Sequence, residues 1–410
     1  MVVMRYWKFQ IVLLFLFCWG LSSCSWKPIR QFAYVENAFE PGTRRASELE
    51  CSATSDYIPW SGFSGITPVR TIRLNIHFMN SSDGSKNLKG QRAIRFATQL
   101  VESANRDLAN NQKMRLPLRN QTPVLDPLIR YEIVSDARGN PAIYEHFDDA
   151  YYYLVKKGPG RNNYNRAVID KFGIGLDSIL NIFIQAPPPD SLIGENYGGL
   201  KTGVALRNGI RISGPFLTDD RIYTYTGLFN HEVGHILGLR HAWLRDQCDD
   251  TPTHPNCWNF TNDGSECDSL VSNNVMDSNA DQDALTPCQI GIMQHSLTES
   301  RSTKRKFQDD RYCQLQGYPP LVIRDTVFWC REIDVVSDIV IEKNATLVIS
   351  NRVSMPEGGR IMIEKNGKLF LRGDKAVIEN ACGYSWQGIF TKSNQDNQVV
   401  IEDGTSIILN

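Results

Sequence analysis

The chain has 410 residues, 41% of them hydrophobic and 22% charged, so it is long enough for two or three domains with a sizeable core. Its 44 basic and 45 acidic residues nearly balance, without a long run of either sign. This composition excludes the basic surface typical of a nucleic-acid-binding protein, and it excludes a polybasic membrane-binding patch.

The first 24 residues have the composition of an export signal. A basic start is followed by an apolar run from Phe9 to Trp19, which is short for a membrane span. The next residues, Leu-Ser-Ser-Cys, resemble the bacterial lipobox, in which the cysteine is lipidated. We therefore predict a lipoprotein signal peptide over residues 1–24, with Cys24 as the lipidated residue. The lipid would anchor the protein in the cell envelope, at the outer membrane or surface, or the protein would be released from there. An ordinary cleaved signal peptide is the alternative, and both predict export.

The segment from residue 25 to about 310 changes from irregular to periodic. Residues 25–65 mix Pro, Gly, Ser and charges, which indicates a linker or pro-segment. The predicted strands that follow are 70–78, 128–134, 179–184 and, at a sheet edge, 204–212. The predicted helices are 91–108, about 150–172 and 224–239. This alternation predicts an α/β (α+β) domain over residues 66–310, with a mixed sheet covered by helices.

Residues 318–410 form short β-rich segments with Gly and Asn between them. Ile-Glu-Lys-Asn occurs at residues 341–344 and again, 22 positions later, at residues 363–366, each time before a second alternating run. Such a period predicts stacked rungs of a parallel β-solenoid. A small β-sandwich is the alternative, since only two clear copies are visible.

One motif carries recognisable chemistry: His231-Glu232-Val233-Gly234-His235, followed by Gly238 and His241. On a helix, residues four apart share a face, so His231 and His235 can bind one metal. Gly238 permits the left-handed turn that brings His241 back as a third nitrogen ligand. Only seven histidines occur in the chain, and three of them lie in this motif.

Three imidazoles leave one coordination position open, which is typical of a catalytic zinc rather than a structural one. We expect Glu232 to act as general base on a zinc-bound water and to pass the proton to the leaving amine. The sequence thus predicts a zinc-dependent endopeptidase with a protein or peptide substrate. The other histidines, His77, His146, His254 and His295, have no ligand-spaced neighbour, and we expect none of them to bind this zinc.

Residues 66–300 resemble the metzincins and, among these, the pappalysin-like (cytophagalysin) metallopeptidases. The resemblance is carried by the His231 motif, by Asp-Thr-Pro at 250–252 and by Asn-Asn-Val-Met-Asp at 273–277. It implies a metzincin-like catalytic fold and a methionine turn under the zinc, which Met276 would supply. A plain core methionine is the alternative.

The sequence departs from this family at one functional position. The family usually has a tyrosine two residues after the methionine, where it helps to stabilise the oxyanion, and this chain has Ser278. Loss of such a donor costs about 10² to 10³ in rate. A catalytically weakened surface binding or adhesion protein is therefore the competing hypothesis, and a hydrolase of non-peptide amides is a third. Oligomeric state is not predicted.

Eight cysteines lie beyond the signal segment, which in an exported chain indicates disulfides. The resemblance implies two bridges around the substrate cleft, which we assign as Cys248 with Cys267 and Cys257 with Cys288. It also offers Cys51 as a latency cysteine that occupies the zinc, although a disulfide, for instance with Cys313, is the more ordinary interpretation.

Acidic residues in the same segment raise the possibility of calcium, because hard cations take oxygen ligands. They are Asp246, Asp249, Asp250, Asp263, Glu266 and Asp268. A structural calcium site and a solvated acidic loop are both open at this point.

Overall fold

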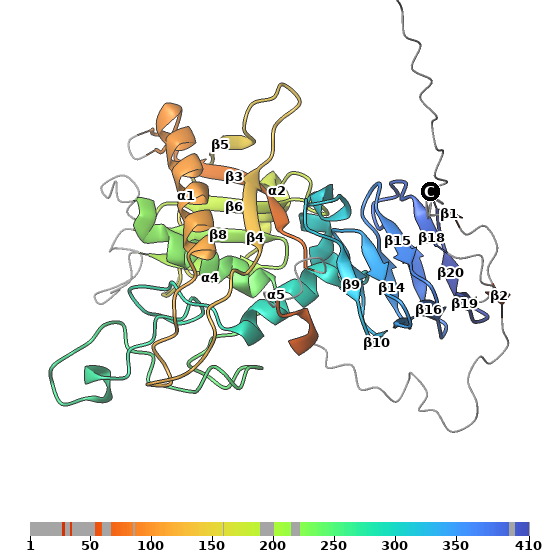
Figure 1. The fold of residues 1–410 in the computed structure, drawn as a ribbon. Coiled ribbons are helices and arrows are strands. Elements are labelled where there is room, and N and C mark those ends of the chain that lie inside the picture. Colours follow the sequence, from red (N-terminus) through yellow and green to blue (C-terminus); the bar gives the residue numbers. More distant parts are fainter. Residues whose placement is uncertain are drawn as a thin grey trace, which may run out of the picture.

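An α/β unit and an all-β unit lie side by side in this computed structural model (Figure 1). The structure describes residues 27–28, 33–34, 54–59, 67–84, 87–158, 160–188, 201–214, 222–392 and 398–409. The predicted signal peptide, Cys24 and Cys51 lie outside these residues. Within the described part, no helix is both long and apolar enough to span a membrane.

A mixed six-stranded sheet forms the centre of the α/β unit, in the order β4-β3-β6-β8-β7, with β5 also pairing β3. Its strands are β3 (Arg70–Asn80), β4 (Ile129–Ile133), β5 (Ile143–Phe147), β6 (Leu180–Gln185), β7 (Thr202–Leu206) and β8 (Gly209–Ser213). All pairs are parallel except β7 with β8. Ile72, Leu74 and Ile76 on β3 are fully buried, as expected for a central strand.

Helices cover this sheet (Figure 1). They are α1 (Gln91–Ala109), α2 (Ala167–Phe172), α4 (Thr226–Ile236) and α5 (Pro287–Thr298). Short 3-10 turns are η2 (Ser55–Tyr57), η3 (Ile222–Tyr225), η4 (Glu266–Asp268), η5 (Thr303–Phe307) and η6 (Asp310–Cys313). α1 packs Phe96, Leu100 and Ala104 into the main core. A capping box between Thr286 and Gln289, with Pro287 at the first helical position, starts α5.

The α/β fold class was predicted correctly, but four elements were not. Of the helix expected over about 150–172, only α2 is helical, and the Asn162 side chain instead bonds the backbone of Tyr153 and Val155. The edge strand expected over 204–212 is a hairpin, which turns at Arg207 with a positive φ of 65°. β5 and α5 were not predicted.

The C-terminal unit is a parallel β-solenoid of three sheets, as the 22-residue repeat predicted. β12 pairs in parallel with β15, so that Ile341 lies beside Ile363 on adjacent rungs. The first sheet contains β9 (Leu321–Ile323), β12 (Ile339–Ile341), β15 (Arg360–Ile363) and β18 (Gly388–Thr391). The second contains β10 (Thr326–Trp329), β13 (Thr346–Ile349), β16 (Lys368–Leu371) and β19 (Val399–Ile401). The third contains β11 (Ile333–Asp334), β14 (Arg352–Ser354), β17 (Val377–Glu379) and β20 (Ser406–Ile407).

Parts of the segment expected as a linker or pro-segment belong to these folded units. β1 (Lys27–Pro28) pairs with β18 and β2 (Ala33–Tyr34) pairs with β19, so both extend the solenoid sheets. Tyr57 in η2 lies against His295 of α5, with ring centroids 4.8 Å apart. The described residues of this segment are thus attached to both units.

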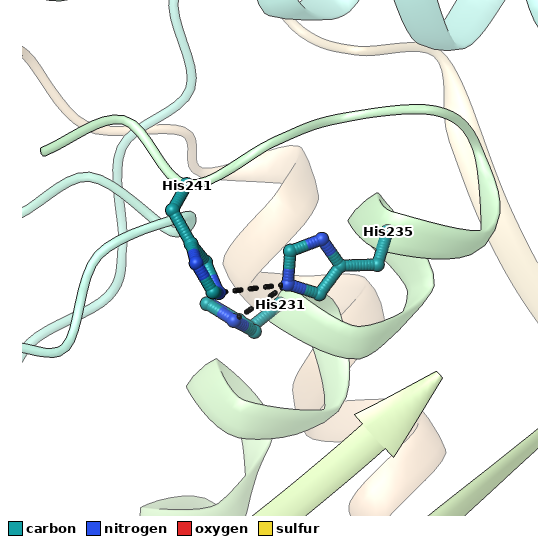
Figure 2. A group of neighbouring side chains, drawn as sticks. All are labelled: His231, His235 and His241. Carbon is teal, nitrogen blue, oxygen red and sulfur yellow. Dashed lines mark hydrogen bonds between the residues drawn. The ribbon is translucent and has the colours of Figure 1, made fainter. Parts of the chain in front are cut away.

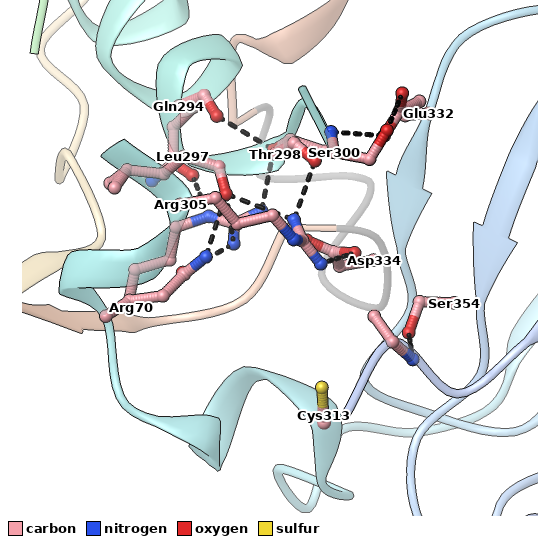
Figure 3. A network of polar contacts seen from close by, with 12 residues as sticks. Arg70, Gln294, Leu297, Thr298, Ser300, Arg305, Cys313, Glu332, Asp334 and Ser354 are labelled. Carbon is pink, nitrogen blue, oxygen red and sulfur yellow. Dashed lines mark hydrogen bonds and ion pairs between the residues drawn. The ribbon is translucent and has the colours of Figure 1, made fainter. Parts of the chain in front are cut away.

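A buried ionic cluster joins the two units (Figure 3). Asp334 of β11 accepts from Arg70 of β3, Arg305 of η5 and Arg352 of β14, at 2.8–3.0 Å. Arg70 also donates to Gln294 and to Thr298 on α5. Sheet, helix and solenoid therefore meet at one carboxylate.

Candidate metal centre

The three motif histidines converge on one point (Figure 2). His231 and His235 lie one turn apart on α4, and Gly238, with φ 102°, turns the chain so that His241 returns to them. The Nε2 atom of His235 lies 3.1 Å from that of His231 and 3.1 Å from that of His241. The structure therefore brings together all three predicted ligands.

The other ring nitrogens and the rings' surroundings fix this orientation. Nδ1 of His231 lies 2.8 Å from the carbonyl oxygen of Val275, and Nδ1 of His235 lies 2.9 Å from that of Leu239. Because a carbonyl only accepts, each Nδ1 carries the proton and each Nε2 directs its lone pair at the shared point. The His241 ring stacks on Trp243, with centroids 4.0 Å apart.

This donor set fits a zinc ion. Burial is the main cause that lowers the pKa of His231 to about 3 and that of His241 to about 4, so both rings are neutral at ordinary pH. Neutral imidazoles with converging lone pairs repel one another unless a cation lies between them. Among the residues the structure describes, the other group with metal-ligand spacing is Cys248, Asp250 and Cys288, and both of its cysteines are in a disulfide.

Met276 lies directly beneath the ligand helix. It is fully buried, and a Cβ added at Gly234 would come within 2.5 Å of its Sδ atom. The backbone N–H of Met276 donates to Asn274 Oδ1 at 2.8 Å, which closes the turn. The next residue, Asp277, is buried and accepts from His254 Nε2 at 2.9 Å. That last pair was missed from sequence, because the two residues are distant in the chain.

Glu232 is buried beside the three histidines. Burial raises the pKa of its carboxyl to about 8, while Lys156 and the backbone N–H of Ala205 on β7 oppose the shift. β7 approaches so closely that a Cβ at Gly203 would lie 2.5 Å from Glu232 Oε1. Only glycine allows this approach without displacing the carboxyl group.

A cleft of about 1170 Å³ opens over this site, with β7 along one wall. Three exposed aromatic side chains, Tyr164, Tyr223 and Trp258, also line it. Ser278 lies in the same lining, and its backbone N–H donates to Asn256 Oδ1 at 3.0 Å. β7 ends the sheet order in the described part of the chain, so its outer edge faces the cleft.

The predicted disulfide pairing near the cleft is wrong, although the four cysteines do form two bridges. Cys248 pairs with Cys288 and Cys257 with Cys267. The reason is that Asp250 accepts from Thr286 Oγ1 and from the backbone N–H of Cys288. These bonds bring the loop containing Cys248 to the start of α5 and leave residues 257–267 to close on themselves.

The suggested bond between Cys51 and Cys313 is also wrong, because Cys313 pairs with Cys382 and ties the connecting segment to the solenoid. Cys330 is disulfide-bonded as well.

The acidic residues proposed for calcium do not gather at one point. Asp246 accepts from Cys248 N and Thr251 Oγ1, and Asp250 caps α5. Asp263 and Asp268 accept hydrogen bonds within their own exposed loop. Among the described residues, no three carboxylates from this segment lie close enough to share an ion. The calcium prediction therefore gains no support.

The remaining histidines lie away from the triad. Nδ1 of His77 on β3 lies 2.9 Å from Nε2 of His146 on β5, and His295 pairs with Glu299 on α5. The His77–His146 contact was missed because β5 was not predicted.

No protein-family model matches the chain, and neither does any curated protein. Among solved structures, the chain is similar to mirolysin in complex with compound 9, at 20% identity over 58% of this chain and 96% of that one, with a TM-score of 0.40. Tannerella forsythia mature mirolysin in complex with a cleaved peptide matches at 20% identity over 58% and 96%, with a TM-score of 0.39. A Tannerella forsythia promirolysin mutant matches at 19% identity over 62% and 86%, with a TM-score of 0.41. Likenesses at this level do not define the chemistry of the site, which comes from the chain's own residues.

Proposed function

We propose that this protein is an exported zinc endopeptidase in which His231, His235 and His241 hold the metal and Glu232 is the general base. The observation that carries this proposal is the convergence of three imidazole Nε2 atoms beside a buried carboxyl group at one wall of a large cleft. A closed structural site would need a fourth protein ligand, and the described residues offer none to the triad.

The chain's residues divide the work of peptide hydrolysis among them. A bound zinc ion would supply the Lewis acid that polarises the scissile carbonyl and acidifies a water. Burial raises the pKa of Glu232, and a cation held by the three histidines would lower it again and keep the carboxyl ionised. The ionised Glu232 takes the proton of the attacking water and delivers it to the leaving amine. The Ala205 N–H holds the Glu232 carboxyl against β7, which fixes the direction in which the proton is taken.

The edge of β7 suits a peptide substrate. An extended peptide can pair with an open strand edge through main-chain hydrogen bonds, and these do not depend on side-chain identity. Because Gly203 and Ala205 of β7 lie against Glu232, a peptide on this edge places its carbonyls near the metal site. This arrangement supports hydrolysis of a peptide bond over hydrolysis of a small amide.

Zinc content and peptide cleavage together test the proposal. The exported protein should bind one zinc and cleave members of a peptide library. Glu232→Gln should keep the zinc and lose activity by about 10²-fold or more, the scale of general-base catalysis. Glu266→Gln, at an exposed site on η4, is the matched control and should cleave like the wild type. An absence of zinc in the wild type would refute the proposal.

Ser278 supports the competing function of a surface binding protein. It lines the cleft at the position where the resembling family has a tyrosine oxyanion donor, and serine is too short to replace that group. Zinc bound by the wild type without cleavage of any peptide would favour this alternative.

We further propose export with a lipid anchor on Cys24. The disulfides of the described residues form and persist in oxidising compartments, which supports export. Mass spectrometry of the N-terminal peptide of the mature protein would detect the lipid, and an unmodified Cys24 would contradict the anchor.

A further inference from the structure

Lys156 differs from the other charged residues that line the cleft. Each of the others has a partner within the protein: Arg106 with Ser103, Asp107 with Thr226, Lys201 with Thr224, Glu232 with the backbone of Ala205, Asp281 with Arg115, and Asp283 with Asn273. Lys156 lines the cleft, is exposed, and has neither a hydrogen bond nor an ion pair with any residue that the structure describes. Its ammonium group is therefore available to a ligand in the cleft.

The position of this charge is close to the reacting groups. Lys156 lines the same cleft as Glu232, His231 and His241. Its neighbour Lys157 is also exposed, but it does not line the cleft. Of these two neighbouring lysines, Lys156 is therefore the one that faces the cleft.

Hydrogen bonds to Asn162 stabilise the loop that carries Lys156. Residue 155, next to Lys156, exchanges two hydrogen bonds with Asn162: Val155 N–H donates to Asn162 Oδ1 at 2.9 Å, and Asn162 N–H donates to the Val155 carbonyl at 2.9 Å. Asn162 Nδ2 also donates to the Tyr153 carbonyl at 3.0 Å. The loop therefore closes on itself through one asparagine.

A buried arginine holds that asparagine in place. Arg211 of β8 is 1% exposed and donates to the carbonyl oxygens of Asn162 and Asn165 and to Gln185 Oε1, at 2.5, 3.0 and 2.7 Å. No carboxylate among the described residues pairs with it, and burial lowers its pKa to about 10. Because a buried guanidinium with unmade hydrogen bonds is costly, its bonds to Asn162 and Asn165 favour this conformation of the loop.

We propose that Lys156 is the substrate-positioning cation of the cleft, which binds a carboxylate of the peptide close to the scissile bond. The carboxylate belongs either to an acidic side chain or to the C-terminus of the peptide, since both present the same two oxygens. This inference rests on the proposed peptidase function for the identity of the ligand. The inference adds to the proposed function that acidic peptides are the preferred substrates.

Binding to an inactive protein tests the proposal without turnover. In the zinc-loaded Glu232→Gln background, calorimetry measures the affinity of matched octapeptides that carry a single Glu or Gln at each position in turn, with a C-terminal acid or amide. We expect at least one acidic peptide to bind about 5-fold more tightly than its neutral match, the effect of one partly exposed charge-assisted pair. Lys156→Met should abolish this preference and Lys156→Arg should keep it.

The Glu scan and the C-terminal acid distinguish the two sources of the carboxylate, and a preference in either arm supports the proposal. Lys157→Met is the matched control and should keep the preference. Equal affinity for acidic and neutral peptides, or a preference that survives Lys156→Met, would overturn it. So would an equal loss of kcat on all peptides in Lys156→Met with the affinities unchanged, because the charge would then act on the developing oxyanion.

The outcomes also separate this inference from the proposed function. Charge-dependent binding without any cleavage by the wild type would retain the role of Lys156 and reject the peptidase. Cleavage by the wild type without a preference for acidic peptides would retain the peptidase function and reject the role of Lys156.

Discussion

Single side chains decide whether this site can work, because the space around Glu232 is so limited. The carboxyl group is packed against the backbone of β7, and the absence of a side chain at Gly203 makes room for it. The ligand rings are oriented by two carbonyl oxygens and by Trp243. Groups outside the histidine triad therefore set the positions of the three rings and of Glu232.

Gly203→Ala should separate metal binding from catalysis. The new Cβ would lie 2.5 Å from Glu232 Oε1, so the carboxyl group must move. A misplacement of about 1 Å costs on the order of 10² in rate, and we expect a loss of kcat of that size with one zinc retained. Gly160→Ala, where a Cβ meets nothing within 4 Å, should behave like the wild type. Unchanged kcat in Gly203→Ala would show that Glu232 does not act from this position.

Trp243→Ala should weaken zinc binding while leaving the fold intact. The indole stacks on the His241 ring, and loss of an orienting group typically lowers metal affinity about 10-fold. Competition with a chelator measures the affinity, and Trp243→Phe, which retains a stacking ring, should recover most of it. An affinity unchanged in Trp243→Ala would show that His241 is held by the backbone alone.

At the scale of elements, strand β5 pairs with β3 through its backbone and also contacts it through a histidine pair, of which His77 is buried and His146 half-buried. His77 on β3 is fully buried and lies between His146 of β5 and Asn181 of β6, at 2.9 and 2.8 Å. Protonation of His77 would give it two donors and remove the acceptor that His146 needs. Burial, together with the neighbouring His146, lowers the pKa of His77 to about 3, although the bond to Asn181 opposes this.

This pair makes stability depend on pH. In the folded protein His77 stays neutral down to about pH 3, whereas in the unfolded chain it takes up a proton below its ordinary pKa of 6.5. Since the unfolded state binds more protons in that window, stability falls as pH drops, by up to about 1.4 kcal/mol per pH unit for one group. Urea unfolding of His77→Phe should show a shallower slope between pH 6.5 and 4 than the wild type. Parallel slopes would mean that His77 is accessible to protons.

Local patterns predicted the elements that carry the ligands, but they did not predict contacts between distant segments. The i and i+4 spacing placed His231 and His235 on one helix face because helical geometry is fixed by the backbone. The disulfide pairing depends on Asp250 capping α5, a contact that cysteine spacing does not encode. Helix α5 was not predicted because most of its surface is buried, so its sequence lacks the alternation of apolar and polar residues that marks an amphipathic helix.

For the whole molecule, the ionic cluster at Asp334 is a buried polar contact between the two units. Burial alone would raise the pKa of Asp334, but Arg305, Arg352 and Arg70 together hold it well below its usual range. These arginines come from the solenoid, from the segment after α5 and from the central strand of the sheet (Figure 3). The carboxylate is the common partner that links the solenoid to strand β3 of the α/β unit.

Asp334→Asn should therefore uncouple the two units. It leaves three guanidinium groups buried around a neutral amide, and breaking a buried pair in this way costs about 3–5 kcal/mol. Calorimetry should resolve two unfolding transitions where the wild type shows one, with the solenoid or the α/β unit melting first. Asp338→Asn removes the carboxylate of a more exposed ion pair with Arg360, at 3.1 Å, and should cost less than about 1 kcal/mol. A single transition in Asp334→Asn with a melting temperature like that of Asp338→Asn would show that apolar packing and the Cys313–Cys382 bond hold the units together without this cluster.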